Sequence, residues 1–193
     1  MQPQDVVFRT YAVQDETAVW RLHEWAMRDT GVDPSVIPGT DDLRSIENSY
    51  FDPGGQFIVG IVERPAFNNV HADLTIESID ATAPEALTTH DGVVVAMGGY
   101  LPNSAGHVDE RDRPGAAELH RMRVAPPCQR YGYGRQLLRE LEERAEANGF
   151  KIMLATTSTT QSAALSFYCD HGYERVREST AGAYDLVHFE KSL

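Results

Sequence analysis

The feature that most constrains this chain is a glycine-containing turn between a predicted strand and a predicted helix. Residues 124–134 read Val-Ala-Pro-Pro-Cys-Gln-Arg-Tyr-Gly-Tyr-Gly; an apolar strand pattern (116–124) precedes them and an amphipathic helix pattern (132–148) follows. Such a turn leaves backbone N–H groups without helical partners at the positive end of the helix dipole, where phosphate-type anions bind. The spacing matches neither a dinucleotide fingerprint nor a Walker loop. Taken alone, it is compatible with an anion site or with a purely structural turn.

The composition indicates one globular domain, residues 1–193. A chain of 193 residues that is 41% hydrophobic buries a core without disulfides or structural metals. No apolar run approaches the roughly 20 residues that span a bilayer, and the first residues lack the pattern of a signal peptide. We therefore expect a cytoplasmic protein with no membrane partner.

The charge excludes one class of partner. A net charge of −12 disfavours nonspecific nucleic-acid binding, which needs a basic face. It suits either the steering of a cationic amine substrate or an acidic surface adapted to concentrated salt. Lysine usage favours the second interpretation, because Lys151 and Lys191 are the only lysines. At about 1 M salt the Debye length is about 3 Å, so repulsion within such a surface is screened. We expect a halophilic protein.

The cysteines and histidines indicate no metal centre. Cys128 and Cys169 lack the spacing of a disulfide framework or of metal ligands, and the seven histidines form no paired-ligand pattern. Cys128 lies in the glycine-containing turn, where helix N-termini lower thiol pKa values and a reactive thiol is conceivable. A small packing residue is the favoured interpretation.

The remaining patterns predict a mixed sheet flanked by helices. Helices are predicted over residues 14–28, 41–50, 132–148 and 162–171. Strands are predicted over residues 6–12, 56–62, 92–101, 116–124, 150–156, 173–178 and 184–191. Residues 64–90 are poorly patterned and hold a possible strand at 73–79, and residues 103–115 are predicted to form an exposed loop.

A second motif changes the interpretation of the turn. Residues 163–173 read Ala-Ala-Leu-Ser-Phe-Tyr-Cys-Asp-His-Gly-Tyr and precede a predicted strand. With the Gln-x-x-Gly-x-Gly turn, this segment resembles the GNAT superfamily of acetyl-CoA-dependent N-acetyltransferases. The turn is similar to the family's pyrophosphate loop, and Ala164, Tyr168, Gly172 and Tyr173 fall in register with its second motif. The resemblance is strong over residues 116–178.

The resemblance implies a GNAT-like α/β (α+β) fold. Its central sheet would be mixed and mostly antiparallel, with about seven strands, about four flanking helices and central strands that splay apart. The cofactor arm would lie in that gap and pair with one strand as an added strand does. Acceptor-side elements would span about residues 14–50, and the cofactor-binding core about residues 92–178 of a single domain.

The resemblance also implies contacts for acetyl-CoA. The backbone of the strand end would pair with pantetheine at Met122, Arg123 and Val124. Backbone N–H groups would hold the pyrophosphate at Gln129, Arg130, Tyr131, Gly132, Tyr133 and Gly134. Arg130 and Arg135 would lie near CoA phosphates, or are ordinary solvated charges at a helix entry.

The second motif would add Gln161 and Ala164 to the cofactor site. Many family members carry an asparagine at the start of this helix, whereas this chain has Gln161, whose amide is one methylene further out. Thr159, Thr160 or Ser162 could supply the contact instead.

Three residues are candidates for catalysis. A phenol stays protonated at neutral pH, so Tyr168 could protonate the departing CoA thiolate, or it could merely pack on the cofactor. Glu118 lies on the strand before the turn and could deprotonate the amine, directly or through water. His120 faces the same side of that strand and is a possible partner or replacement. Alternatively, Glu118 is an edge-strand surface charge paired with Arg121 or Arg123.

The combined motifs favour an N-acetyltransferase that transfers an acetyl group from acetyl-CoA to a primary amine by direct attack in a ternary complex. The acceptor would be a small-molecule or peptide amine. Asp33, Asp41 and Asp42 could recognise its ammonium group or simply belong to an acidic surface. The alternatives are a non-catalytic acyl-CoA-binding module and an anion-binding structural domain. A homodimer through the C-terminal strands is possible.

Overall fold

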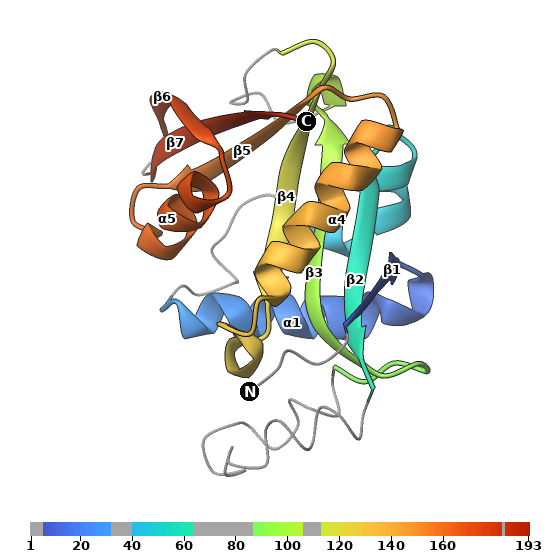
Figure 1. Cartoon of the computed structure of the whole chain (residues 1–193). Coiled ribbons are helices and arrows are strands. Elements are labelled where there is room, and N and C mark those ends of the chain that lie inside the picture. The colour runs from blue at the N-terminus through green and yellow to red at the C-terminus, as the bar shows by residue number, and fades with distance from the viewer. Residues whose placement is uncertain (1–5, 32–39, 64–86, 106–112, 183) are drawn as a thin grey trace.

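The computed structural model describes residues 6–31, 40–63, 87–105, 113–182 and 184–193. They contain a seven-stranded sheet in the order β1-β2-β3-β4-β5-β7-β6 (Figure 1). The β4–β5 pair is parallel, and the other neighbouring strands are antiparallel. The predicted mixed, mostly antiparallel sheet is therefore confirmed.

The elements follow the predicted order. The strands are β1 (Val7–Thr10), β2 (Gln56–Val62), β3 (Val93–Pro102), β4 (Ala116–Val124), β5 (Ile152–Ser158), β6 (Glu174–Ala181) and β7 (Tyr184–Ser192). The α-helices are α1 (Glu16–Asp29), α4 (Tyr133–Ala147) and α5 (Ser162–Asp170). Short helical turns are η1 (Val13–Asp15), η3 (Thr40–Arg44), η4 (Glu47–Phe51), η5 (Asn103–Ala105) and η6 (Pro126–Cys128). The possible strand at 73–79 lies outside the described residues.

The single helix predicted over residues 41–50 is wrong. A 3₁₀ helix, η3, is followed by the π-helical turn η4, in which the Asp52 N–H bonds to the Glu47 carbonyl at 3.1 Å. This wider turn accompanies the complete burial of Tyr50, whose ring packs edge-on against Phe57 at 4.9 Å between centroids. The Tyr50 hydroxyl donates to Asp42 Oδ2 at 2.7 Å, which ties η4 back to η3. Packing thus overrides the regular helical pattern.

The two faces of the sheet carry separate cores (Figure 1). On one face, α1 contributes Val19 and Leu22 to a cluster that includes η3 and η4 residues. On the other face, α4 buries residues spaced as one helical stripe, namely Leu137, Leu138, Leu141 and Ala145. None of the helices within the described ranges is both long and apolar enough to cross a membrane.

The central strands splay apart, as predicted. β4 and β5 pair only from Ala116–Ile152 to Glu118–Leu154. Beyond that point β4 continues along β3 to Val124, while β5 continues along β7 to Ser158. Figure 1 shows the resulting opening between the two strands.

A β-bulge lies in the splayed half of β4. Gly99 pairs with His120 and Met97 pairs with Arg123, so Gly98 faces two residues, Arg121 and Met122. Arg121 has a φ of +53°, which is uncommon for a residue other than glycine. The extra residue places two consecutive side chains on one face of the sheet. On that face His120 contacts the Tyr50 ring and Arg121 bonds to Asp42 of η3.

Candidate functional site

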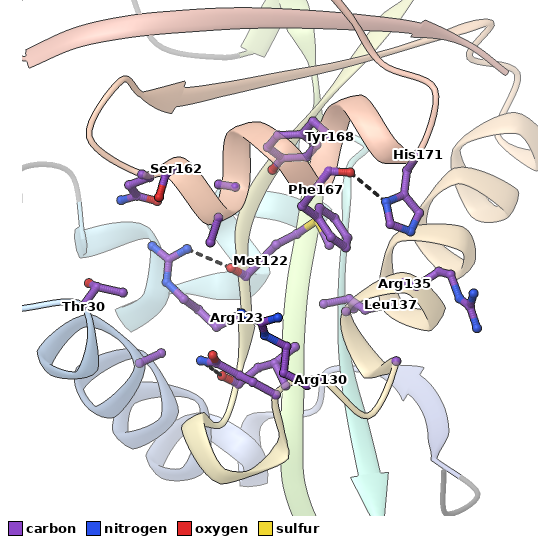
Figure 2. A pocket seen from close by; sticks show the side chains of 18 of the residues that line it. Thr30, Met122, Arg123, Arg130, Arg135, Leu137, Ser162, Phe167, Tyr168 and His171 are labelled. Carbon is purple, nitrogen blue, oxygen red and sulfur yellow. Dashed lines mark hydrogen bonds between the residues drawn. The ribbon is translucent and has the colours of Figure 1, made fainter. Parts of the chain in front are cut away.

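A cavity of about 1170 Å³ lies between β4 and α5, where β4 and β5 have separated (Figure 2). It reaches the start of α4 and the end of α1. Most predicted site residues line it: Met122, Arg123, Val124, Gln129, Arg130, Tyr131, Gly132, Gly134, Arg135, Gln161, Ala164 and Tyr168. Glu118, His120 and Tyr133 are not among its lining residues. The cavity is large enough for a cofactor arm together with a second ligand.

The β4 backbone presents hydrogen-bonding groups to this cavity. The Ala125 N–H bonds to the Val95 carbonyl on β3 at 2.8 Å, and strand residues alternate in the direction of their backbone groups. The backbone groups of Met122 and Val124 therefore face the gap. Their carbonyls accept side-chain donors, from Arg123 Nη1 at 2.8 Å and from Gln129 Nε2 at 3.5 Å respectively. An extended ligand could pair with this edge by taking the place of those side chains.

The turn before α4 has the geometry of an anion site. Gly132 is the N-cap of α4 with a φ of +87°, and Arg130 also has a positive φ, of +68°. The Gln136 N–H bonds to the Gly132 carbonyl at 3.1 Å, so the preceding N–H groups have no partner within the helix. The guanidinium groups of Arg130 and Arg135 add positive charge to the same wall of the cavity.

Gly134 lines the cavity, and its lack of a side chain enlarges it. A Cβ at this position would lie 3.6 Å from Phe167 and 3.7 Å from Val124, which are ordinary van der Waals distances. The packing of the protein therefore does not require a glycine here. Since Gly134 lines the cavity, a side chain would reduce the room for a ligand.

Tyr168 reaches the cavity from α5 (Figure 2). Its ring is 8% exposed and packs against Tyr173 and Phe189, with centroids 5.4 and 5.3 Å away. Its hydroxyl makes no hydrogen bond to another residue that the structure describes. Burial raises the pKa of Tyr168 to about 12, with Arg123 opposing and Glu118 adding to the effect. The phenol is therefore protonated at neutral pH, in a residue that lines the cavity.

Glu118 is buried in the central strand β4, so the interpretation as an edge-strand surface charge is wrong. It is 2% exposed, and its two oxygens accept from Asn103 Nδ2 at 3.2 Å and from Thr156 Oγ1 at 2.7 Å. Arg121 pairs instead with Asp42, Nε to Oδ2 at 2.9 Å. Glu118 lies within electrostatic reach of Tyr168, whose pKa it raises. Its role as a base stays a prediction, and it would need a water relay.

The loop predicted over residues 103–115 is not exposed where it begins. Asn103 is only 7% exposed, because its amide bridges two segments. It donates to Glu118 and accepts from the Arg113 N–H at 2.6 Å. Residues 106–112 of this loop lie outside the described ranges.

Three further predicted residues lie in the protein core or beside it. The Tyr133 side chain is 3% exposed and stacks with Tyr131, with centroids 6.4 Å apart, so only its backbone could serve the anion site. His120 contacts the Tyr50 ring, 6.3 Å between centroids, and does not line the cavity. Cys128 is 1% exposed and burial raises the pKa of its thiol to about 12, which agrees with a packing residue.

The rim of the cavity includes several candidate residues of the second motif. Gln161 lines it together with Thr160 and Ser162, whereas Thr159 does not. The Gln161 Oε1 accepts a weak hydrogen bond from Thr157 Oγ1 at 3.4 Å, and its amide nitrogen remains available for a ligand. Thr160 and Ser162, the alternatives to Gln161 that line the cavity, are therefore also positioned for a cofactor contact.

The sequence placed residues 14–50 on the acceptor side but did not single out any residue of α1 as part of the site. Ala26 and Met27 of α1 and its C-cap residue Thr30 line the cavity, and His23 lies one turn earlier. His23 is fully buried, and neither ring nitrogen has a hydrogen-bond partner among the described residues. Burial lowers the pKa of His23 to about 4, and Arg123 and Arg121 lower it further. The helical pattern predicted the positions of these residues on α1, but it did not predict that α1 packs beside β4.

The described residues contain no group of three or more His, Cys, Asp or Glu side chains that could hold a metal ion.

The fold is shared with solved acetyltransferases. An acetyltransferase of the GNAT family from Staphylococcus aureus Mu50 has 14% identity and a TM-score of 0.68, covering 97% of this chain and 99% of that chain. The PaiA N-acetyltransferase from Thermoplasma acidophilum in complex with coenzyme A has 13% identity and a TM-score of 0.65, covering 98% and 100%. The protein yncA from Salmonella typhimurium, with its cofactor acetyl-CoA, has 17% identity and a TM-score of 0.63, covering 97% and 93%.

The sequence assigns the family directly. The model of the acetyltransferase (GNAT) family matches residues 19–173, and the chain therefore belongs to this family. No curated protein matches the chain in sequence.

His23 predicts a loss of stability in acid. The folded protein favours neutral His23, with its pKa near 4, whereas the unfolded chain takes up a proton near pH 6.5. Stability therefore falls as the pH drops from 6.5 towards 4, by about 2–3 kcal/mol at pH 4.5 from this residue. In urea unfolding at pH 7 and pH 4.5, His23→Leu should lose that much less stability than wild type. His90→Gln, which changes an exposed histidine, should behave like wild type. Equal acid losses in wild type and His23→Leu would contradict the prediction.

Proposed function

We propose that this protein transfers an acetyl group from acetyl-CoA to a primary amine by direct attack in a ternary complex. The observation that carries the proposal is the continuity of two features. The gap-facing backbone of Met122 and Val124 leads directly into the turn before α4, where Gly132 caps the helix. One extended ligand with a polyamide arm and a pyrophosphate would fit both. Family membership supports acetyl transfer as the reaction.

The cofactor would follow the wall of the cavity. Its pantetheine arm would replace the Arg123 and Gln129 side chains on the Met122 and Val124 carbonyls and pair with β4 as an added strand. The N–H groups that precede Gln136 would hold the pyrophosphate at the positive end of α4. Arg130 and Arg135 would neutralise phosphate charge on the same wall.

The chemistry needs no covalent enzyme intermediate. The neutral amine nitrogen attacks the thioester carbonyl carbon, and the new C–N bond produces a tetrahedral oxyanion. A gap-facing N–H near Val124 would stabilise that charge. Collapse breaks the C–S bond, and the CoA thiolate takes its proton from Tyr168. The proton lost by the amine passes through water towards Glu118 and solvent, and the Tyr168 phenolate regains a proton by the same route.

The acceptor in this proposal is a small-molecule or peptide amine. The cavity reaches Ala26, Met27 and Thr30 of α1, which leaves room for it beside the cofactor arm. A homodimer, a cytoplasmic location and adaptation to salt stay predictions.

The reaction itself can be tested with an amine panel. Acetyl-CoA would be incubated with the protein and polyamines, free amino acids, an N-terminal peptide or a lysine peptide, in dilute buffer and in molar KCl. We expect protein-dependent release of CoA thiol with at least one class of amine. Acetyl-CoA binding by calorimetry without thiol release from any amine would favour the acyl-CoA-binding module. The absence of any thermal shift with CoA would indicate the anion-binding structural domain.

Tyr168→Phe should lower turnover more than cofactor binding, because it removes the proton donor and leaves the ring. We expect kcat to fall about 100-fold, at the lower end of general-acid contributions, with little change in the acetyl-CoA KM. The matched control is Tyr173→Phe, whose hydroxyl donates to Glu142 at 2.9 Å outside the cavity. That variant should lose about 1 kcal/mol of stability and keep its kcat. Unchanged turnover in Tyr168→Phe would remove Tyr168 from the mechanism.

Gly134→Ala should separate cofactor binding from folding. The added Cβ meets only ordinary contacts within the protein, so the unfolding free energy should stay equal or rise, by up to about 1 kcal/mol. Because the methyl group takes cavity space, the Kd for acetyl-CoA should rise about tenfold in calorimetry. Gln136→Ala, two residues along α4 and outside the cavity lining, is the control and should bind as wild type. Wild-type affinity in Gly134→Ala would place the cofactor elsewhere.

A further inference from the structure

Arg123 is a partly buried cation that forms no salt bridge with a carboxylate in the described part of the chain. Its Nε is inaccessible to water and has no hydrogen-bond partner within the described part of the chain. Its Nη1 donates to the carbonyl of its own neighbour, Met122, at 2.8 Å. No ion pair joins it to a described carboxylate, in contrast to Arg9, Arg121 and Arg144. Burying part of a guanidinium without an ion-pair partner costs free energy, so its position on the cavity wall suits an anionic ligand.

One nearby carboxylate, Asp42, acts favourably on Arg123, but the two side chains form no salt bridge. The groups that act on it electrostatically are Arg121, Tyr168, Tyr50 and Asp42. Asp42 Oδ2 already accepts from Arg121 Nε at 2.9 Å and from the Tyr50 hydroxyl at 2.7 Å. His23, the remaining neighbour, is neutral because its pKa is low. Burial and the charge of Arg121 lower the pKa of Arg123 to about 10, so it still carries its positive charge at neutral pH.

Arg123 lies at the reacting end of the cavity. It acts electrostatically on Tyr168, the group proposed to protonate the thiolate. Figure 2 shows its side chain extending towards Ser162 and Thr30, whereas Arg135 lies on the opposite side of β4 beside α4. Arg130 and Arg135 flank the turn where phosphates would bind. The cofactor phosphates therefore have their own cations, and Arg123 faces the space left for the acceptor.

Cofactor binding would release Arg123 from its one contact. The Met122 carbonyl faces the gap, where pantetheine is proposed to pair. Once an amide of the cofactor donates to that carbonyl, the Arg123 guanidinium retains no hydrogen bond within the described residues. Its planar fork of donors then suits a carboxylate, which it can bind through two parallel hydrogen bonds.

We infer that the acceptor is a small amine that carries a carboxylate, such as a free amino acid, and that Arg123 binds this carboxylate. The inference rests on the proposed acetyl transfer and names the substrate class of the same site. A bound carboxylate would also hold the amine in one orientation beside the thioester, and a charge-assisted pair discriminates strongly against an uncharged analogue.

The test compares matched pairs of acceptors. Free amino acids and their carboxamides would be assayed with acetyl-CoA by CoA thiol release, with each amine's kcat/KM corrected for its fraction of neutral amine. Wild type should prefer the carboxylate by about 10- to 100-fold. Arg123→Gln should bring this ratio close to one, chiefly through the KM of the amino acid. Arg123→Lys, which keeps the charge but loses the fork, should retain part of the preference.

Controls separate recognition from folding. Arg139→Gln removes an arginine from the outer face of α4, where it pairs with Glu143 at 2.8 Å, and should leave the ratio unchanged. Near-ultraviolet circular dichroism and the CoA thermal shift would establish that each variant is folded. If Arg123→Gln does not fold, the wild-type ratio and Arg123→Lys still decide the matter.

The possible outcomes are distinct. Equal kcat/KM values for amino acids and carboxamides in wild type would overturn the inference and leave the proposed function intact. Equal losses for both members of each pair in Arg123→Gln would assign Arg123 to the chemistry rather than to the carboxylate, and would also overturn it. No thiol release from any amine would mean that acetyl transfer itself is wrong, and the inference falls with it.

Discussion

The whole site depends on the early end of one strand pairing. β4 and β5 separate after three residue pairs, although both strands continue. Backbone groups buried between them then lack a ladder partner, which a folded protein tolerates only if something else satisfies them. Here Arg123 and Gln129 cover the two gap-facing carbonyls, and the cavity occupies the remaining space. The cavity between β4 and α5, and the place of Tyr168 on its wall, follow from this separation.

The parts of the site that could be predicted are those encoded locally. Gly132 adopts a left-handed conformation that only glycine reaches cheaply, and the helix after it starts at once, so the turn could be predicted from the sequence. An anion site remained one of two interpretations of that turn until the second motif was considered. The second motif places Ala164 and Tyr168 on the same nine-residue helix, and both residues line the cavity. The apolar stripe of α4 and the apolar run of β4 are also local patterns, and they predicted this strand and the helix that covers it.

The parts that could not be predicted depend on contacts between distant segments. The bulged residues Arg121 and Met122 include no glycine to mark them, and Arg121 is held by Asp42 of another element. Glu118 reads as a charge on a strand, yet Asn103 and Thr156 enclose it. His23 lies beside Leu22 on α1, and only the packing of this helix over β4 turns a surface residue type into a buried one. Local patterns do not encode which helix approaches which strand.

The two covered carbonyls also shape the thermodynamics of ligand binding. Since Met122 and Val124 already accept side-chain donors, a ligand that pairs with β4 exchanges hydrogen bonds instead of adding them. The heat released by that exchange is small, because bonds of similar strength are broken and formed. Affinity must then arise from charge neutralisation at the turn and from water expelled from the apolar walls. The strand edge would therefore determine where a ligand lies more than how tightly it is held.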